Sequence, residues 1–281
     1  MQAQESRGDA PIDFAAIGGE ARLPPLGDAA RQLLALSDDE DFDARVLSVI
    51  AQGDPVHLAR LVSLANAAAR GLTRPALTAD EAIRVIGTRD ARAAMLALAL
   101  AATFAGGTDT VALRMRLVVH AVNLVLSARR VSSFLALDRA QAATLQMAAL
   151  FDPLGIHAAL VLPHRQRDRL VAALRVDPPG VTWPHGVAVL DGYWLASAAI
   201  ARGWRVGDEV VTAIASRWTG PQCGEVGPDA ALLWLTHELL ARRLRGERDC
   251  AGLLAAAHPL PQDVAAQLAS ERAADLAYSE A

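Results

Sequence analysis

The sequence predicts an all-α fold, and three observations lead to that prediction. Alanine and leucine, both strong helix formers, dominate nearly every segment of the chain. The period-two alternation of β-branched residues that is typical of half-buried strands is scarce. Helix-initiating patterns recur, because Thr78 precedes Glu81 at capping-box spacing and Asp54 stands directly before Pro55. Together these features predict a multi-helical fold of about eleven helices.

The boundaries of the expected helices follow from capping residues and glycines. Ser37 and Glu40 repeat the capping-box spacing, and Pro228-Asp229 places a proline where a helix starts. Stop signals are expected at Gly53, Gly71, Gly87, Gly106-Gly107, Gly203 and Gly220. The expected helices span residues 25–37, 41–52, 55–69, 79–87, 89–104, 109–135, 138–151, 163–175, 185–202, 207–218 and 229–245.

One apolar run is long enough to raise the question of a membrane. The 16 residues between Arg92 and Asp109 are uncharged and rich in alanine. A membrane-spanning helix needs about 20 apolar residues, so the run predicts a buried helix instead. Amphipathic stripes predict two further packed helices. These stripes are Val206, Val210, Val211, Ile214 and Trp218, and Leu232, Leu235, Leu239 and Leu240.

Composition excludes several classes of protein. The chain has 281 residues, of which 53% are hydrophobic and 21% are charged, so it is not a disordered chain. Its net charge of −4 argues against nucleic acid as a partner. All 27 basic residues are arginine, which excludes a lysine Schiff base and a P-loop lysine. Cys223 and Cys250 form no CxxC pair, and no signal peptide is evident, so a cytoplasmic, membrane-free location is expected.

The segment DPVHLARLVSLANAAARGLTRPALTADEAIRVIG, residues 54–87, resembles the HDOD domain, an all-helical relative of the HD phosphohydrolases. Further likenesses are the opening motif Leu23-Pro24-Pro25-Leu26, His120, residues 148–155, and His185 with the closing helices that follow it. The resemblance covers about residues 20–218. The matching motif residues in the first segment are Asp54, Pro55, Arg60, Asn66 and Gly87.

The resemblance also suggests how the chain is organised. A flexible N-terminus is expected over residues 1–19, followed by the HDOD domain over residues 20–219. Within that domain, residues 20–106 form an N-terminal helical part and residues 107–219 an HD-like part. The Pro- and Gly-containing stretch 220–227 marks the start of a C-terminal helical extension, residues 220–281.

HD enzymes hydrolyse phosphate esters with a bound metal, and the resemblance places their metal pattern in this chain. His120 and Asp152 match two of its positions, but Phe151 stands where the histidine of the His-Asp pair belongs. A phenylalanine ring cannot ligate a metal, and hard divalent cations need several O or N ligands. The chain is therefore expected to carry no catalytic metal and no other cofactor.

Other residues are weak replacements for the lost ligand. His185 and Asp191 are the remaining candidates for this degenerate site, and neither His157 nor His164 has the spacing of HExxH. From the residues alone, His120 fits a hydrogen-bonded core imidazole and Asp152 a turn carboxylate before proline. Asn66, in an apolar stretch, is expected to tie backbone together.

Two surface features have both a structural and a partner-binding interpretation. Trp183 lies in a Pro-rich stretch and is the tryptophan most expected to be exposed, where it would suit an interface. Arg242 and Arg243 suit the C-terminal end of a helix, where cations complement the dipole, or else an anionic partner.

The function expected from the resemblance is that of a stand-alone bacterial signal-transduction or regulatory protein without catalysis. Its expected partners are signalling proteins such as receiver, kinase or second-messenger components, and a nucleotide ligand is a further candidate. The alternative is a metal-dependent phosphohydrolase or phosphodiesterase with an altered HD site, which would lose activity on substitution of His120 or Asp152. Isologous homodimers are common, so a homodimer stays open, although nothing in the sequence locates an interface.

Overall fold

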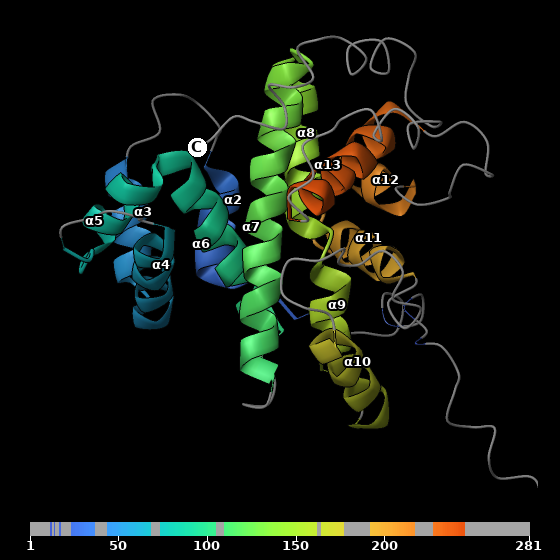
Figure 1. Cartoon of the computed structure of the whole chain (residues 1–281), viewed down its shortest axis with the longest axis horizontal. Helices are drawn as coiled ribbons and strands as arrows, with labels where there is room; N and C mark the ends of the chain where they lie inside the picture. Colours follow the sequence, from blue (N-terminus) through green and yellow to red (C-terminus); the bar gives the residue numbers. More distant parts are fainter. Residues whose placement is uncertain are drawn as a thin grey trace, which may run out of the picture.

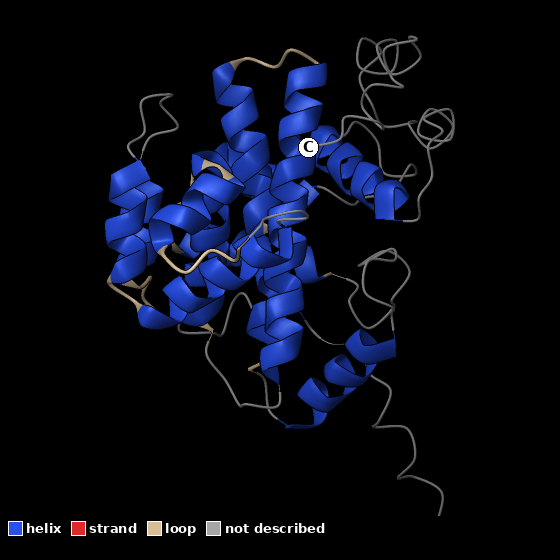
Figure 2. Ribbon diagram, turned by 60° about the vertical axis from the view of Figure 1, so that its left-hand side comes forward, coloured by secondary structure: helices blue, strands red, loops and turns tan. Residues whose placement is uncertain are grey.

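The fold is taken from a computed structural model, and the residues that it describes are 12, 14, 17, 24–36, 44–68, 74–104, 110–161, 164–176, 192–216 and 227–244. These residues form helices joined by loops and contain no strand, so the prediction of an all-α fold is confirmed (Figure 2). The helices are α2 (Asp28–Ala35), α3 (Ala44–Gln52), α4 (Pro55–Ala68), α5 (Ala79–Ile86), α6 (Thr88–Thr103), α7 (Val111–Phe134), α8 (Arg139–Phe151), α9 (Leu154–Ala159), α10 (His164–Val176), α11 (Tyr193–Gly203), α12 (Asp208–Ser216) and α13 (Pro228–Leu244).

Helix α7 runs through the middle of the molecule and divides the other helices into two groups (Figure 1). The group α2–α6 lies on one side, and α8–α13 lie on the other. Helix α7 contacts both groups, because it packs against α6, α8 and α13. Among the described residues, α7 is also the helix long and apolar enough to cross a membrane, but half of its most apolar window is buried inside the protein.

The alanine-rich run after Arg92 forms the buried part of α6, as predicted. Every residue from Ala93 to Ala101 is buried. Small side chains on this helix let its neighbours approach closely, and α6 contacts α2, α4, α5 and α7. The guanidinium of Arg92 donates hydrogen bonds to the carbonyls of Leu33 and Leu36, at 3.3 and 2.6 Å, and so holds the end of α2 against α6. Partial burial lowers the pKa of Arg92.

The helix starts predicted in the N-terminal half are confirmed where they are described. The hydroxyl of Thr78 accepts from the Glu81 backbone N–H, and the Glu81 carboxylate accepts from the Thr78 N–H in return. The hydrogen bond from the Leu77 backbone N–H, more than any other interaction, lowers the pKa of Glu81. Helix α5 ends at Gly87, whose φ of +89° favours glycine. The Ser37–Glu40 pattern, Gly71, Gly106-Gly107 and Gly220 lie outside the described residues.

The structure differs from the predicted helices in two places. The short helix α9, Leu154–Ala159, lies between the expected helices 138–151 and 163–175, where the sequence predicted no helix. The helix expected over residues 185–202 does not run through residue 192, because Gly192 adopts a left-handed conformation, φ +85°, and α11 starts at Tyr193. The residues before Gly192 in that range lie outside the described part of the chain.

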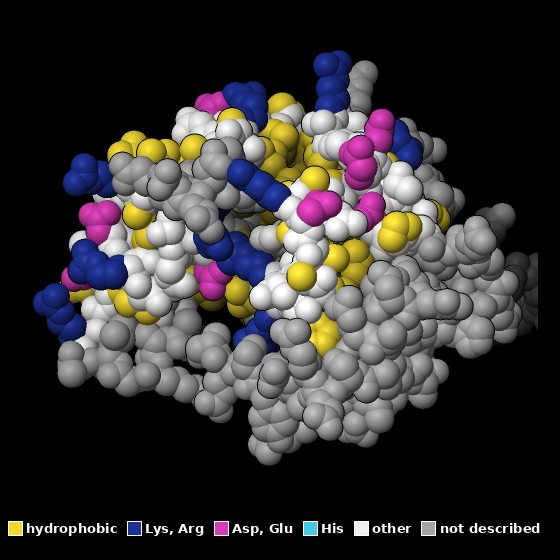
Figure 3. All heavy atoms as spheres, turned by 90° about the horizontal axis from the view of Figure 1, so that it is seen from above, with side chains coloured by type: hydrophobic (Ala, Val, Ile, Leu, Met, Phe, Trp, Pro, Cys, Tyr) yellow, Lys and Arg dark blue, Asp and Glu magenta, His cyan; other side chains and the backbone are white. Residues whose placement is uncertain are grey.

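The surface carries both signs of charge. Arginine and acidic side chains are interspersed with apolar ones over the face shown in Figure 3, and arginines surround a hollow near its centre. Pairing between opposite charges is one reason for this mixture. Arg129 contacts Asp90 and also donates to the Gln146 side chain at 3.0 Å.

Candidate functional site

Asp152 is the centre of a buried polar cluster at the end of α8. Its side chain is fully inaccessible to solvent. One carboxylate oxygen, Oδ2, accepts a hydrogen bond from the Tyr193 hydroxyl at 2.7 Å. The same oxygen lies 3.2 Å from Nε2 of His237. A buried carboxylate needs such partners, because they replace the water it loses on folding.

The partners of Asp152 come from two helices that lie far from it in sequence. Tyr193 is the first residue of α11, and the turn at Gly192 aims it towards the end of α8. His237 lies in the middle of α13 and is 2% exposed. The ring of His120, on α7, is 6.1 Å from the ring of His237, measured between centroids. Helices α7, α8, α11 and α13 therefore converge on one polar core.

Phe151 occupies the position of the missing histidine and acts as a packing residue. It is fully buried. Its ring meets the edge of the Trp204 ring at a centroid distance of 6.3 Å and an interplanar angle of 75°. The indole Nε1 of Trp204 donates to the Pro24 carbonyl at 3.1 Å, which fastens the start of the domain to the end of α11. Phe151 thus belongs to an aromatic cluster and presents no ligand atom.

Helix α9 packs closely against α11 next to the Asp152 cluster. The Gly155 N–H donates to the Ser197 hydroxyl at 2.8 Å, and that hydroxyl also lies beside the carbonyl of Asp152. A Cβ atom on residue 155 would collide with the Tyr193 carbonyl oxygen, at a separation that no real Cβ tolerates. Glycine is therefore required at position 155 for this approach.

His157, also on α9, is a buried imidazole with an unsatisfied ring nitrogen. It is 1% exposed, and its Nδ1 atom has no hydrogen-bond partner in the structure as described. Burial, with a smaller contribution from the positive charge of Arg114, lowers the pKa of His157 from 6.5 to about 3. His157 is consequently neutral at neutral pH.

These residues do not fit the metal that the HD enzymes bind. Phe151 contributes no ligand, and the Asp152 carboxylate is engaged by Tyr193 and His237. Over the described ranges, no group of three or more His, Cys, Asp or Glu side chains could hold a metal ion. His185 and Asp191, the other expected members of the degenerate site, lie outside those ranges.

The motif residues Asp54, Pro55 and Asn66 of segment 54–87 begin a helix or hydrogen-bond to the backbone. Asp54 caps α4 by accepting from the His57 N–H at 3.2 Å, and Pro55 is the first residue of that helix. Asn66 ties backbone together, as predicted, because its amide group donates to the Ala76 carbonyl at 3.0 Å and accepts from the Ala76 N–H at 2.7 Å. Arg60 is half-buried on α4.

Two of the three candidate partner-binding residues, Arg242 and Arg243, lie in the part of the chain that the structure describes. Arg242 and Arg243 form the last turn of α13, as the helix-end interpretation expects. Arg242 pairs with Glu238 at 3.0 Å, and Arg243 is exposed. Trp183 lies outside the described residues. Of the predicted candidates, Phe151 and Asp152 are neighbours at the end of α8, and His120 lies beside the His237 ring that contacts Asp152.

Tyr193 and His237 were not among the predicted site residues. His237 stands inside the apolar stretch Leu232–Leu240, as His120 stands inside the apolar part of α7. A histidine within a buried stripe needs a polar partner, and that signal could have linked His237 to the cluster. Tyr193 had no such signal.

The comparisons with known proteins agree on the fold. The chain shows 16% identity and a TM-score of 0.57 to a "putative phosphohydrolase" from Shewanella amazonensis SB2B, covering 95% of this chain and 97% of that one. It shows 17% identity and a TM-score of 0.53 to an HDOD domain protein with unknown function from Geobacter sulfurreducens, covering 83% and 78%. No curated protein matches it. The family model of the HDOD domain matches residues 23–219, well over half of the sequence, and the chain therefore belongs to the HDOD domain family.

Proposed function

We propose that this chain is a non-catalytic regulatory protein of the HDOD family, which acts by binding other molecules. The observation that carries the proposal is the state of Asp152. Its carboxylate is fully buried and is bonded to a tyrosine and a histidine of the same chain. The carboxylate therefore contributes to packing, where an HD hydrolase would use it to hold a metal.

The chemistry of hydrolysis supports the same conclusion. A catalytic metal site keeps at least one position open for water or substrate. Here Phe151, Asp152 and His237 are each at most 2% exposed. The Asp152 carboxylate has no surface exposed to solvent, and α11 and α13 supply the side chains that contact it. Such a closed polar core is suited to a scaffold whose surface contacts partners.

The partners we propose follow from membership of the family. They are signalling proteins, such as receiver, kinase or second-messenger components, or a nucleotide ligand, in the cytoplasm of a bacterium. The net charge of −4 does not favour nucleic acid. The alternative function, a metal-dependent phosphodiesterase with an altered site, is the outcome that the following experiment would reveal.

The test measures metal content and turnover on the full chain. The protein is incubated with Mn, Fe, Mg and Zn salts, desalted, and analysed by inductively coupled plasma mass spectrometry. Turnover of bis(p-nitrophenyl) phosphate is measured with each metal in excess, so that weakly held Mg is also tested. We expect no metal near one equivalent and no turnover above that of the buffer.

Variants make the result specific to the cluster. Asp152→Asn and His120→Ala remove candidate ligands, and Asp80→Asn removes an exposed carboxylate on α5 as the matched control. Circular dichroism establishes whether each variant folds. Near-stoichiometric metal and turnover that persist in Asp80→Asn but vanish in His120→Ala would contradict the proposal and identify a hydrolase.

A further inference from the structure

In the described part of the chain, the buried side-chain nitrogen and oxygen atoms that make no hydrogen bond all belong to three neighbouring helices. They are Nε and Nη2 of Arg114 on α7, Nδ1 of His157 on α9 and Nε of Arg167 on α10. Helices α9 and α10 lie beside the N-terminal half of α7 (Figure 1), and Arg116 on α7 donates to the Leu174 carbonyl on α10 at 2.8 Å. All of these atoms are nitrogens, and those of arginine can only donate. The group that this region lacks is therefore an acceptor.

Arg114 presents two of these donors side by side. Nε and Nη2 stand along one edge of the planar guanidinium, and such an edge donates two parallel hydrogen bonds to two oxygens of one anion. Arg114 has other interactions, which leave this edge without a hydrogen bond. The rest of the side chain is partly exposed, so the edge lies close beneath the surface. The shape of the edge therefore favours an oxyanion.

His157 supplies a third donor close to Arg114. Its ring is 1% exposed, and the positive charge of Arg114 acts on it, adding to the effect of burial in lowering the His157 pKa to about 3. The neutral ring carries one proton, and an acceptor beside Nδ1 fixes that proton on Nδ1. The two oxygens of a carboxylate are already taken by the Arg114 edge. A tetrahedral anion such as phosphate has a further oxygen for His157.

The charge of this region also favours an anion over a neutral acceptor. The sequence of α10 has four arginines and one aspartate, and residues 111–120 of α7 include Arg114 and Arg116 but no acidic residue. The aspartate, Asp168, is exposed, and its Oδ1 atom is 3.7 Å from Nη2 of Arg167. Basic side chains thus collect here although the whole chain has a net charge of −4. A negative ligand is attracted to such a region.

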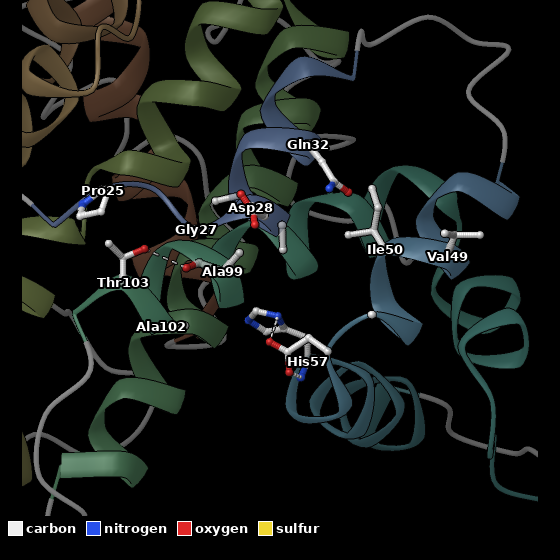
Figure 4. A pocket seen from close by; sticks show the side chains of 14 residues that line it. Pro25, Gly27, Asp28, Gln32, Val49, Ile50, His57, Ala99, Ala102 and Thr103 are labelled. Carbon is white, nitrogen blue, oxygen red and sulfur yellow. Dashed lines mark hydrogen bonds and ion pairs between the residues drawn. The ribbon is translucent and has the colours of Figure 1, made fainter.

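A cavity in the N-terminal half of the molecule offers no comparable set of atoms. It has a volume of about 580 Å³ and lies between α2, α3, α4 and α6 (Figure 4). Its polar groups already contact one another, because Nδ1 of His57 is 2.9 Å from Oδ2 of Asp54 and Asp28 pairs with Arg31. Its size would admit a small molecule, but its walls select none.

We propose that Arg114 and His157 bind a phosphate group between α7 and α9. The Nε and Nη2 donors of Arg114 hold two of its oxygens, and Nδ1–H of His157 holds a third. The phosphate is either the free ion or the terminal group of a phosphate monoester. This proposal goes beyond the regulatory role proposed above and does not depend on it.

The test titrates inorganic phosphate, AMP and acetate into the full chain, in a buffer free of phosphate and sulfate and at constant ionic strength. The Cε1–Hε1 resonance of His157 is followed in proton–carbon NMR spectra. The chain contains 7 histidines, and His157→Leu identifies this resonance by its disappearance. We expect a saturable shift with phosphate or AMP, and at least about tenfold weaker binding of acetate, which lacks the third oxygen.

Variants connect the binding to the Arg114 edge. Arg114→Lys keeps the positive charge and removes the pair of parallel donors, so phosphate should bind at least about tenfold more weakly, and Arg114→Gln should bind it no better. Arg84→Gln is the matched control, because Arg84 is an exposed arginine on α5, and it should bind as the unmodified chain does. Circular dichroism establishes whether each variant folds.

The titration of the unmodified chain is decisive even if the Arg114 variants do not fold. The absence of a saturable His157 shift with both phosphate and AMP, or equal affinity for acetate, would overturn the proposal. Unchanged phosphate affinity in folded Arg114→Lys and Arg114→Gln would overturn it as well. Tighter binding of AMP than of phosphate would identify a phosphate monoester as the ligand, and the reverse order would identify the free ion. None of these readouts depends on metal or turnover.

Discussion

At the scale of single residues, the replacement of a histidine by Phe151 changes the role of its neighbour. A His-Asp pair directs both side chains to one metal. In this chain Phe151 packs on Trp204, and Asp152 is left to find donors of its own. The Tyr193 hydroxyl donates to its Oδ2 atom, and Nε2 of His237 lies 3.2 Å from the same oxygen. The substitution therefore converts a ligand pair into one aromatic contact and one polar contact.

His157 provides a prediction at the same scale. Its pKa in the folded chain is about 3, below the 6.5 of the free side chain, so the unfolded chain binds the extra proton first as pH falls. Lowering the pH from 6.5 towards 3 therefore stabilises the unfolded state relative to the folded state. We expect the free energy of unfolding to fall by about 2 kcal/mol between pH 7 and pH 5 because of this residue.

The measurement is urea unfolding of the protein and of His157→Leu at both pH values. The leucine variant lacks the imidazole, so its loss of stability on acidification should be smaller by that amount. Equal losses in the two proteins would show that His157 is protonated as easily in the folded chain as in the unfolded one.

At the scale of elements, α9 exists because of tertiary contacts. A helix of 6 residues is too short to be stable alone. Its position depends on Gly155, whose N–H donates to Ser197 on α11. This contact also sets the position of Tyr193, since Tyr193 and Ser197 stand one turn apart on α11. The geometry of the Asp152 cluster therefore depends on how closely α9 and α11 approach.

Substitution of Gly155 tests this dependence. In Gly155→Ala the new Cβ would collide with the Tyr193 backbone carbonyl, so the two helices must separate. We expect a destabilisation of about 3 kcal/mol, measured by denaturant unfolding. Gly27→Ala is the matched control, because a Cβ there meets no atom within 4 Å, and its effect should stay within about 0.5 kcal/mol. Similar stabilities for the two variants would contradict the close approach of α9 and α11.

At the scale of the whole molecule, the domain is completed by a helix that lies beyond its family match. The match ends at residue 219, whereas α13 begins at Pro228. Helix α13 packs against α7, α8 and α12, and it supplies His237 to Asp152. The buried leucines of its apolar stripe are Leu232, Leu235, Leu239 and Leu240. The helix is thus a part of the core.

A chain that ends at residue 219 should consequently lose most of its stability. Four buried leucines contribute roughly 2 kcal/mol each, and the total approaches the whole stability of a typical domain. We expect this truncated chain to unfold without a cooperative thermal transition and to bind the dye ANS. A chain that ends at residue 244 keeps α13 and is the control. A cooperative transition at an unchanged temperature in the shorter chain would show that α13 does not contribute to the stability of the core.

Local signals in the sequence predicted most of the helices but neither α9 nor the full site. Thr78 and Asp54 carry their partners within three residues, and so their caps were predictable. Asn66 was predictable as a backbone tie, although its partner Ala76 was not. The degenerate pair at Phe151 and Asp152 was visible because it lies in one motif. Tyr193 and His237 reach Asp152 only through the packing of α11 and α13, which no local pattern specifies.

The hydrogen bond from Trp204 to the Pro24 carbonyl has a consequence for synthesis of the chain on the ribosome. It joins residues that are 180 positions apart. At about 5–20 residues per second, roughly 10 to 35 seconds pass between the appearance of the first partner and that of the second. During that interval the Pro24 carbonyl lacks its indole donor, and Phe104 at the end of α6 lacks the Trp204 ring that it packs against. The contacts of Trp204 with Pro24 and Phe104 therefore form only after most of the domain has been synthesised.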